Sequence, residues 1–160
     1  MAMHRDLSRL GPGRQQGMAL LISLVFLLLL TLIGVSSLRN ATLQEKMAAS
    51  LSLRNQSFQA AESALRIGEG AVQQGRYTLP ACARCPPPAE SSGLTVAGAN
   101  SHSGVTWVAT DQGFYGLQNL GTTLDAVNLP RHTAATLYRV TAVGVAGHSR
   151  TVLESIYAKY

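Results

Sequence analysis

The residues best suited to chemistry in this chain are two cysteines, in the stretch Cys82-Ala83-Arg84-Cys85. This C-x-x-C spacing suits a local disulfide, a redox-active pair or one half of a zinc site. A redox-active pair needs a helix N-terminus and a strand–helix–strand pattern, and neither is predicted nearby. A zinc site needs a second pair of ligands, and the three downstream histidines, His102, His132 and His148, do not pair in spacing. We therefore favour a disulfide that closes an irregular loop, with the redox pair, the zinc site and two free thiols as alternatives.

The sequence lacks the motifs that mark common catalytic and metal-binding sites. It contains no G-x-S-x-G, no H-E-x-x-H, no Walker-type glycine loop and no EF-hand loop. Each of the three histidines is flanked by loop residues, where a lone histidine is usually a solvated surface residue. Two glycosylation sequons, at Asn40 and Asn55, fall within a predicted helix and are treated as chance matches. We expect no catalytic residues, no metal site and no cofactor.

The second chemical feature is the peptide bond between Gly17 and Met18, where a short basic leader meets a long apolar run. No residue from Gln15 to Leu38 is charged. Met18–Leu38 comprises 21 residues, which form a helix of about 31 Å and match a hydrocarbon core of about 30 Å. Because basic residues precede the run, the positive-inside rule places the N-terminus in the cytoplasm and the remainder outside, where a disulfide is permitted.

Three kinds of N-terminus fit this pattern: a signal peptide cleaved after the run, an uncleaved signal anchor, and a leader cleaved before the run. The small-x-small triplet Gly34-Val35-Ser36 supports the first kind. However, helical patterning continues past Leu38 without a break, whereas a cleaved signal peptide is normally followed by an unrelated domain. We therefore predict cleavage between Gly17 and Met18, which leaves the apolar run as the new N-terminus.

The segment from Arg39 to about Gln74 is predicted to continue the same helix. It contains no proline and is rich in alanine, which favours helix. Apolar residues recur along it at steps of three, four and seven, at Leu43, Met47, Leu51, Phe58, Ala61, Leu65 and Val72. We expect this stripe to be the core face of the rest of the chain, with a coiled-coil seam as the alternative. Gly68, Gly70 and Gly75 mark the expected end of the helix.

Residues 76–160 are expected to form a small β-sheet head. Tyr77–Gly104 is rich in proline, glycine and serine, and predicts a loop. Three segments predict strands, the last two joined as a hairpin: Val105–Thr110, Leu137–Val145 and Thr151–Tyr160. Asp111 to about Ala135 predicts a packed connection. The predicted fold class is therefore α+β, with a long N-terminal helix packed on three or four antiparallel strands.

The basic residues of the chain are scattered. The net charge is +5, but lysines and arginines form no run, and only 6% of the residues are aromatic. Nucleic-acid binding usually requires a clustered basic face with interleaved aromatic residues. We therefore expect no nucleic-acid partner, and at most a weak attraction to anionic lipid headgroups.

The N-terminal segment resembles the corresponding region of type IV pilus minor pilins of the PilX type. The shared features are a basic residue and a glycine before the apolar run, the polar residues that close it, and the stretches LQEKMA and RNQSFQAAESALRIGE at their spacing. The resemblance covers about the first 70 residues and is looser over the head, where the final paired strands fit. It implies a prepilin leader at residues 1–17, cleaved after Gly17, and N-methylation of Met18. It also implies that residues 18–38 span the membrane and later pack into a filament, and that residues 39–75 pack on the sheet.

One position departs from the pattern of major pilins. Those pilins carry a glutamate five residues into the mature chain, which is thought to pair with the terminal amine of a neighbouring subunit. Here the fifth mature residue is Ile22. Without this charge, the resemblance implies a place at or near the filament tip, or in the complex that starts assembly.

The resemblance therefore implies a structural subunit that helps to initiate type IV pilus assembly. Its implied partners are other minor pilins, the major pilin, a prepilin peptidase, the inner-membrane assembly platform and a tip adhesin. Its implied location is the bacterial inner membrane, as a single-pass protein with a cytoplasmic N-terminus and a periplasmic head, and afterwards the pilus. Two alternatives remain: a minor pseudopilin of a type II secretion system, and a secreted binding module or hydrolase with a conventional signal peptide.

Overall fold

The computed structural model describes residues 16–82, 85–127, 129–130 and 132–160. The expected leader therefore lies outside the described residues, apart from Gln16 and Gly17. The described chain contains the helix α1 (Gln16–Gln73), the 3-10 helix η1 (Ala89–Ser92) and five strands. The strands are β1 (Gly98–Ala99), β2 (Thr106–Thr110), β3 (Gly113–Thr123), β4 (Ala135–Ala146) and β5 (Ser149–Lys159). The predicted α+β class, with one long N-terminal helix and an antiparallel sheet, is confirmed.

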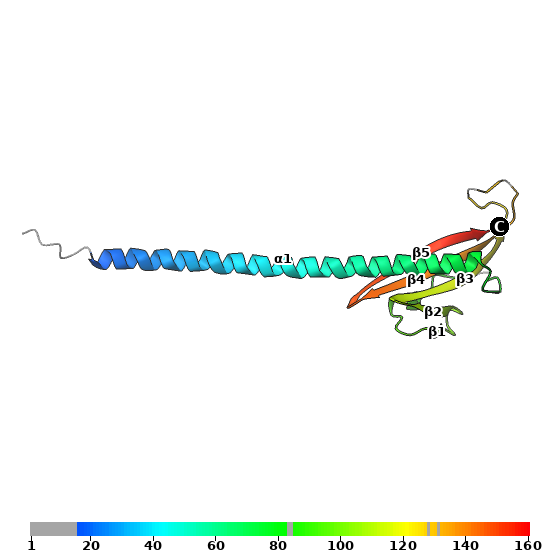
Figure 1. The fold of residues 1–160 in the computed structure, drawn as a ribbon, viewed down its shortest axis with the longest axis horizontal. Helices are drawn as coiled ribbons and strands as arrows, with labels where there is room; N and C mark the ends of the chain where they lie inside the picture. The colour runs from blue at the N-terminus through cyan, green and yellow to red at the C-terminus, as the bar shows by residue number, and fades with distance from the viewer. Residues whose placement is uncertain (1–15, 83–84, 128, 131) are drawn as a thin grey trace, which may run out of the picture. The chain divides into compact units, whose positions relative to one another are not determined.

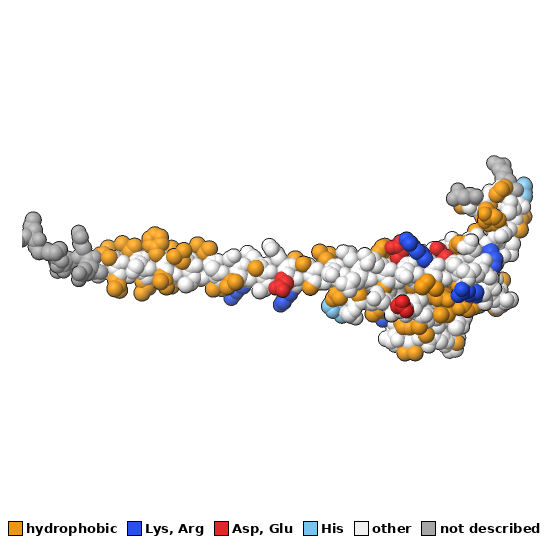
Figure 2. Space-filling model, in the orientation of Figure 1, with side chains coloured by type: hydrophobic (Ala, Val, Ile, Leu, Met, Phe, Trp, Pro, Cys, Tyr) orange, Lys and Arg blue, Asp and Glu red, His pale blue; other side chains and the backbone are white. Residues whose placement is uncertain are grey.

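The chain divides into two compact units between Met47 and Ala48. The described part of the first unit is the N-terminal portion of α1. Its apolar side chains are unburied, and Figure 2 shows hydrophobic atoms over this portion of the helix. The hydroxyls of Ser23, Thr31 and Thr42 donate to backbone carbonyls three residues earlier, at 2.8, 2.8 and 2.9 Å. These polar groups are therefore satisfied inside the helix and are compatible with a lipid environment.

In the second unit the strands form one antiparallel sheet in the order β1-β2-β3-β4-β5. Figure 1 shows the C-terminal part of α1 lying across this sheet. The predicted hairpin is confirmed: β4 and β5 pair continuously from Ala146 opposite Ser149 to Thr136 opposite Lys159. Their two-residue turn contains Gly147 at φ 57°, a left-handed conformation that favours glycine and suits a tight hairpin.

The strand β3 shows that the prediction for residues 111–135 was wrong over its first half. The segment was expected to be a connection, but β3 is the central strand of the sheet. Its glycines lower the strand signal in the sequence, although the tertiary packing requires one of them. A Cβ on Gly116 would lie 2.5 Å from Val105 Cγ1 and 3.1 Å from the Trp107 ring. With β3, and with the short β1 inside the predicted loop, the sheet has five strands rather than three or four.

Small side chains form the surface of α1 that packs on the sheet. The buried residues on this surface are Ser57, Ala60, Ala61, Ala64, Gly68, Ala71 and Val72. The predicted core stripe was therefore correct only for Ala61, Leu65 and Val72, since its earlier members Leu43, Met47, Leu51 and Phe58 are exposed. Leu43 and Met47 belong to the first unit, and beside Gly144 the helix backbone lies so close to β4 that only small side chains fit between them.

Two glycines show how close this approach is. A Cβ on Gly144 of β4 would collide with the backbone oxygen of Ser57 and the backbone nitrogen of Ala61. A Cβ on Gly68 would lie 2.6 Å from Val140 Cγ1. Gly68 was expected to mark the helix end, but it lies inside α1 as a packing residue. The helix ends at Gln73, close to the predicted end at about Gln74, and Gly75 follows it.

The end of α1 is a Schellman motif. Gly75, at φ 66°, donates its N–H to the Val72 carbonyl at 3.0 Å, and Arg76 donates to the Ala71 carbonyl at 3.1 Å. The chain then turns back along the sheet, where the Tyr77 and Tyr115 hydroxyls lie 3.0 Å apart. Burial, together with this hydrogen bond, raises the pKa of Tyr115 to about 12. Its phenol is therefore neutral at physiological pH.

The segment between Tyr77 and Gly104 helps to cover the other face of the sheet. Neighbouring residues of a strand point to opposite faces, and β3 and β4 accordingly contribute to two cores. Tyr115, Leu117 and Val140 pack with the helix, whereas Phe114, Val143 and Val145 pack with Leu94, Val105 and Trp107. The central strands β3 and β4 are therefore buried on both faces, whereas Val152 and Ile156 of β5 stay exposed. Two cores help to stabilise a head of this size.

Glu90 in η1 fixes part of this covering segment to the sheet. Its Oε1 accepts hydrogen bonds from Trp107 Nε1, at 3.2 Å, and from the Ser103 hydroxyl. Partial burial acts to raise the pKa of Glu90, but the hydrogen bonds from Ser103, its own backbone and Trp107, with the charge of His102, lower it below its usual value. Glu90 is therefore a carboxylate that accepts both side-chain bonds.

The contact at Gly144 predicts a large effect of a side chain there. Replacing Gly144 with Val should destabilise the head by about 3 kcal/mol, because the added atoms force α1 away from the sheet. Urea unfolding of the full chain in detergent, followed by the fluorescence of Trp107, measures this change. Gly93→Ala is the control, since its Cβ meets nothing within 4 Å, and should stay within about 0.5 kcal/mol. Equal unfolding midpoints for the two variants would contradict the close approach.

Candidate functional site

The predicted processing and assembly residues lie at the start of α1. The helix begins at Gln16, so Gly17 and Met18 are in its first turn, and Ile22 follows one turn later. All three are exposed, and a Cβ at Gly17 would have no neighbour within 4 Å. Met18 and Ile22, four residues apart, share one side of the helix. The bond between Gly17 and Met18 is therefore accessible in the described unit.

The apolar run that follows forms a surface that no other described part of the chain covers. Large side chains between Met18 and Leu38 are about half or more exposed. Figure 2 shows hydrophobic atoms along this part of the helix. Burial of each such side chain contributes about 1.5–3 kcal/mol. By length and composition, α1 contains a stretch able to cross a membrane. This surface requires either lipid or the helices of other subunits.

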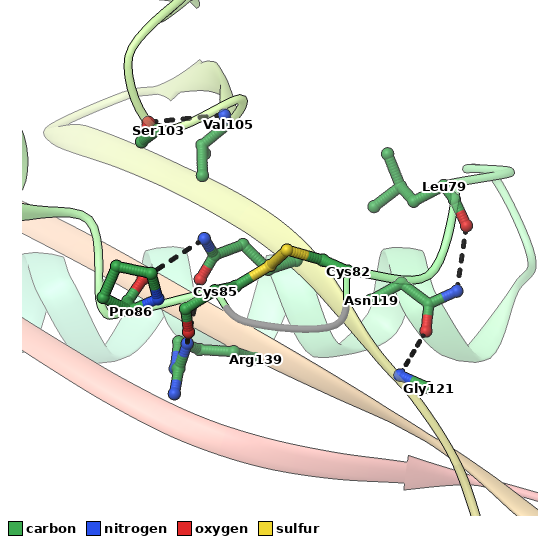
Figure 3. Close-up of a disulfide and its surroundings, with 10 residues drawn as sticks. Leu79, Cys82, Cys85, Pro86, Ser103, Val105, Asn119, Gly121 and Arg139 are labelled. Carbon is green, nitrogen blue, oxygen red and sulfur yellow. Dashed lines mark hydrogen bonds between the residues drawn. A yellow bond between two sulfur atoms is a disulfide. The ribbon is translucent and has the colours of Figure 1, made fainter.

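The second candidate site is the pair Cys82 and Cys85, whose sulfur atoms are bonded in the structure (Figure 3). The Cα atoms are 5.8 Å apart, within the usual range for disulfides. The bond closes a short loop that lies beside β3. Cys82 donates its N–H to the Asn119 carbonyl at 2.8 Å, and Ala81 forms an isolated parallel bridge with Asn119.

Arg139 of β4 connects this loop to three strands. Its Nη1 donates to the Cys85 carbonyl at 2.6 Å and to Gln118 Oε1 at 3.1 Å. Its Nε donates to Glu154 Oε1 at 2.9 Å. The side chains of Arg139 and Glu154 are only 14% and 34% exposed, so this ion pair is better protected from solvent than an ordinary surface pair. The loop, β3, β4 and β5 are thus joined through one guanidinium group.

Asn119 holds the other end of the loop. It lies at the bulge where the register between β3 and β4 shifts. Its Nδ2 donates to the Leu79 carbonyl and its Oδ1 accepts from the Gly121 N–H, both at 2.9 Å (Figure 3). Cys85 is therefore held by the Arg139 side chain and Cys82 by the Asn119 backbone carbonyl, while the Asn119 side chain holds Leu79 just before them.

Sequence analysis did not identify Arg139 or Asn119. The signal in the sequence was a polar residue within a segment expected to pack. Arg139 lies in a predicted strand, and Asn119 lies in the predicted packed connection. Which groups they reach depends on the register of β3 with β4, which the sequence does not give.

The structure does not bring the cysteines together with the histidines. His102, His132 and His148 are exposed. Among the described residues, no group of three or more His, Cys, Asp or Glu side chains could hold a metal ion. The described arrangement around Cys82 and Cys85 thus consists of hydrogen bonds that anchor a loop.

Comparison with known proteins identifies the N-terminal region. A family model described as PilX N-terminal matches residues 16–66. The chain carries a PilX-type N-terminal region. The match supports the PilX-type minor pilin family of type IV pili, whose members are structural pilus components rather than enzymes. No curated protein and no solved structure matches the chain.

The PilX-type region contains the predicted processing and assembly residues but not the disulfide. It includes Gly17, Met18 and Ile22, the whole apolar run, and the helix as far as Arg66. A pilin role related to type IV pili follows, with association with other pilus components and a location in membrane and pilus. Residues 67–160 lie outside the match, so the head is interpreted from its own structure.

The contacts of Arg139 predict that the disulfide and this arginine act together. Replacing both cysteines with Ala should cost about 2 kcal/mol, because the reduced unfolded chain gains loop entropy. Arg139→Met should cost about 2 kcal/mol through unpaired acceptors and Glu154. The combined variant should show a coupling of about 1 kcal/mol. Unfolding of the full chain in detergent measures each value, with exposed Arg66→Met as the uncoupled control. Additive losses with Arg139 would show that the loop and the arginine are independent.

Proposed function

We propose that this chain is a minor pilin-like structural subunit that helps to initiate type IV pilus assembly, at or near the filament tip. The observation that carries the proposal is the helix α1, which continues from the unburied apolar run into the head within the PilX-type region. The first part supplies a surface for lipid or neighbouring helices. The second part belongs to a folded head that is carried with it.

The proposed processing step is cleavage between Gly17 and Met18 by a prepilin peptidase, followed by N-methylation of Met18. The continuity of α1 supports cleavage at this position over cleavage after the apolar run. A cut near Gly34-Val35-Ser36 would divide a regular helix and remove the apolar surface from the mature protein. A cut before Met18 keeps that surface at the new N-terminus.

Before assembly, the apolar run holds the subunit in the bacterial inner membrane, with the N-terminus in the cytoplasm and the head in the periplasm. The Cys82–Cys85 disulfide suits this orientation, because disulfides persist in oxidising compartments. During assembly the run leaves lipid and packs against other minor pilins and the major pilin. The inner-membrane platform and a tip adhesin complete the proposed partners.

Ile22 supports a position at the end of the filament. A carboxylate buried among apolar helices is tolerated only when a positive charge pairs with it. At the end of a filament, the carboxylate would lack its partner, the N-terminal amine of a neighbouring subunit. An isoleucine at this position removes the need for that partner, so the subunit can begin a filament without burying an unpaired charge.

The mature N-terminus tests the processing step. Mass spectrometry of the membrane fraction should find a chain that begins with N-methylated Met18. Gly17→Val should block this cleavage and leave Met1 in place, since a bulky side chain then occupies the exposed residue before the bond. Gly34→Val, in the same helix with equally open space, is the control and should be processed normally. A mature chain that starts near Ser37 in soluble material would disprove the pilin proposal.

The side chain at Ile22 tests the position in the filament. Ile22→Glu should reduce surface filaments at least about tenfold, because an uncompensated buried carboxylate costs several kcal/mol. Ile22→Leu keeps the apolar surface and should leave the filament number unchanged. Filaments are counted by electron microscopy and subunit levels by immunoblot. Normal incorporation and piliation with Ile22→Glu would remove the support for an initiating or tip position.

A further inference from the structure

The head contains a pocket of about 600 Å³ beside the β2–β3 and β4–β5 turns. This volume lies within the range of pockets that bind small molecules or peptide side chains. Its walls come from α1, from the segment before β1 and from both turns. The residues that line the pocket include Gln56, Thr95, Ala109, Asp111, Gln112 and Arg150.

Arg150 is the lining residue with an unsatisfied group. Its Nη1 is buried and has no hydrogen-bond partner among the described residues. A buried charged donor normally has a partner, because a lost hydrogen bond to water is otherwise not replaced. The residue as a whole is only partly buried. Because Arg150 also lines the pocket, its guanidinium group is placed to meet an acceptor that enters there.

The carboxylate among the lining residues, Asp111, does not form an ion pair with Arg150. The ion pairs of the described residues are Arg66–Glu62 and Arg139–Glu154. Asp111 is exposed at a turn, where water solvates its charge. Arg150 therefore offers a positive charge that the described part of the chain leaves unneutralised.

The other walls suit a segment of polypeptide. The outer edge of β2 has a partner strand only at Thr106 and Trp107, so Ala109 is at an open edge beside the pocket. An extended chain can add to such an edge through backbone hydrogen bonds. The amides of Gln56 and Gln112 both donate and accept, and Leu94 and Phe114 supply apolar surface.

We propose that this pocket receives a carboxylate-bearing segment of a neighbouring pilus subunit, with the carboxylate paired to Arg150. The proposal rests on the proposed function, because it assumes that the head adjoins other subunits in an assembly. Arginine binds carboxylates through two parallel N–H bonds, which fixes the orientation of the incoming segment. The contact gives the head a specific neighbour in addition to the packing of apolar helices.

Site-specific photo-cross-linking in the full chain tests the proposal in piliated cells. A photoreactive residue at Thr95, on the exposed rim, should cross-link to a pilus subunit, and the joined peptide should contain Asp, Glu or a C-terminus. Arg150→Gln should lower the yield at least about tenfold, because it removes the charge that binds the carboxylate. Arg150→Lys should retain part of the yield. Arg66→Gln, an exposed arginine elsewhere on the head, should leave it unchanged.

Two further variants keep the test decisive. Trp107 fluorescence in purified Arg150→Gln reports whether the head still folds. If it does not, Gln112→Trp, at an exposed rim position, fills the pocket without entering the core and should abolish the cross-link. A cross-link that persists in these variants, or that joins lipid or a peptide without a carboxylate, overturns the proposal.

A photoreactive residue at exposed Leu43 of α1 separates this proposal from the proposed function. If Leu43 cross-links to pilins and Thr95 does not, the pocket proposal is wrong and the pilin proposal stands. If neither position cross-links to pilus subunits, the proposed function fails, and the pocket proposal fails with it.

Discussion

The head depends on the close contact between α1 and β4, where Gly144 lies against the backbone of Ser57 and Ala61. At this point no side chain fits between the two backbones, and α1 carries small residues there, namely Ser57, Ala60, Ala61 and Ala64. Where apolar packing is absent, the Ser57 hydroxyl lies 3.1 Å from Ser149 Oγ and 2.8 Å from Thr151 Oγ1. The helix is thereby bound to the first residues of β5 as well as to β4.

This contact determines which side chains of α1 remain outside the head. Because alanines, a serine and a glycine occupy the inner surface, large residues such as Leu51, Phe58 and Ile67 remain exposed. Their exposure is otherwise costly in water. In a pilin these side chains are available to neighbouring subunits, and they continue the apolar character of the N-terminal run. One helix thus serves an intramolecular core and an intermolecular surface with different residues.

The opposite face of the sheet is organised by polar anchors rather than by another helix. Arg139 holds the disulfide loop, and Glu90 holds η1 to Trp107 and Ser103. These anchors lie where the sequence between α1 and β2 has little regular structure of its own. Without these anchors, the conformational-entropy cost of ordering this proline-rich backbone would be uncompensated. The result is that the central strands β3 and β4 are covered on both faces, in a head that a single core would barely stabilise.

The sequence alone was sufficient to predict the elements whose patterns are local. An uncharged apolar run, an alanine-rich helix without proline, its end near Gly75 and the β4–β5 hairpin all follow from composition, periodicity and turn residues. The PilX-type resemblance was also carried by contiguous residues. Only the tertiary structure showed β3 as the central strand, Gly144 and Gly68 as packing positions, and Arg139 and Arg150 at their sites. These depend on strand register and on the separation of helix and sheet, which are set by contacts between residues far apart in the chain.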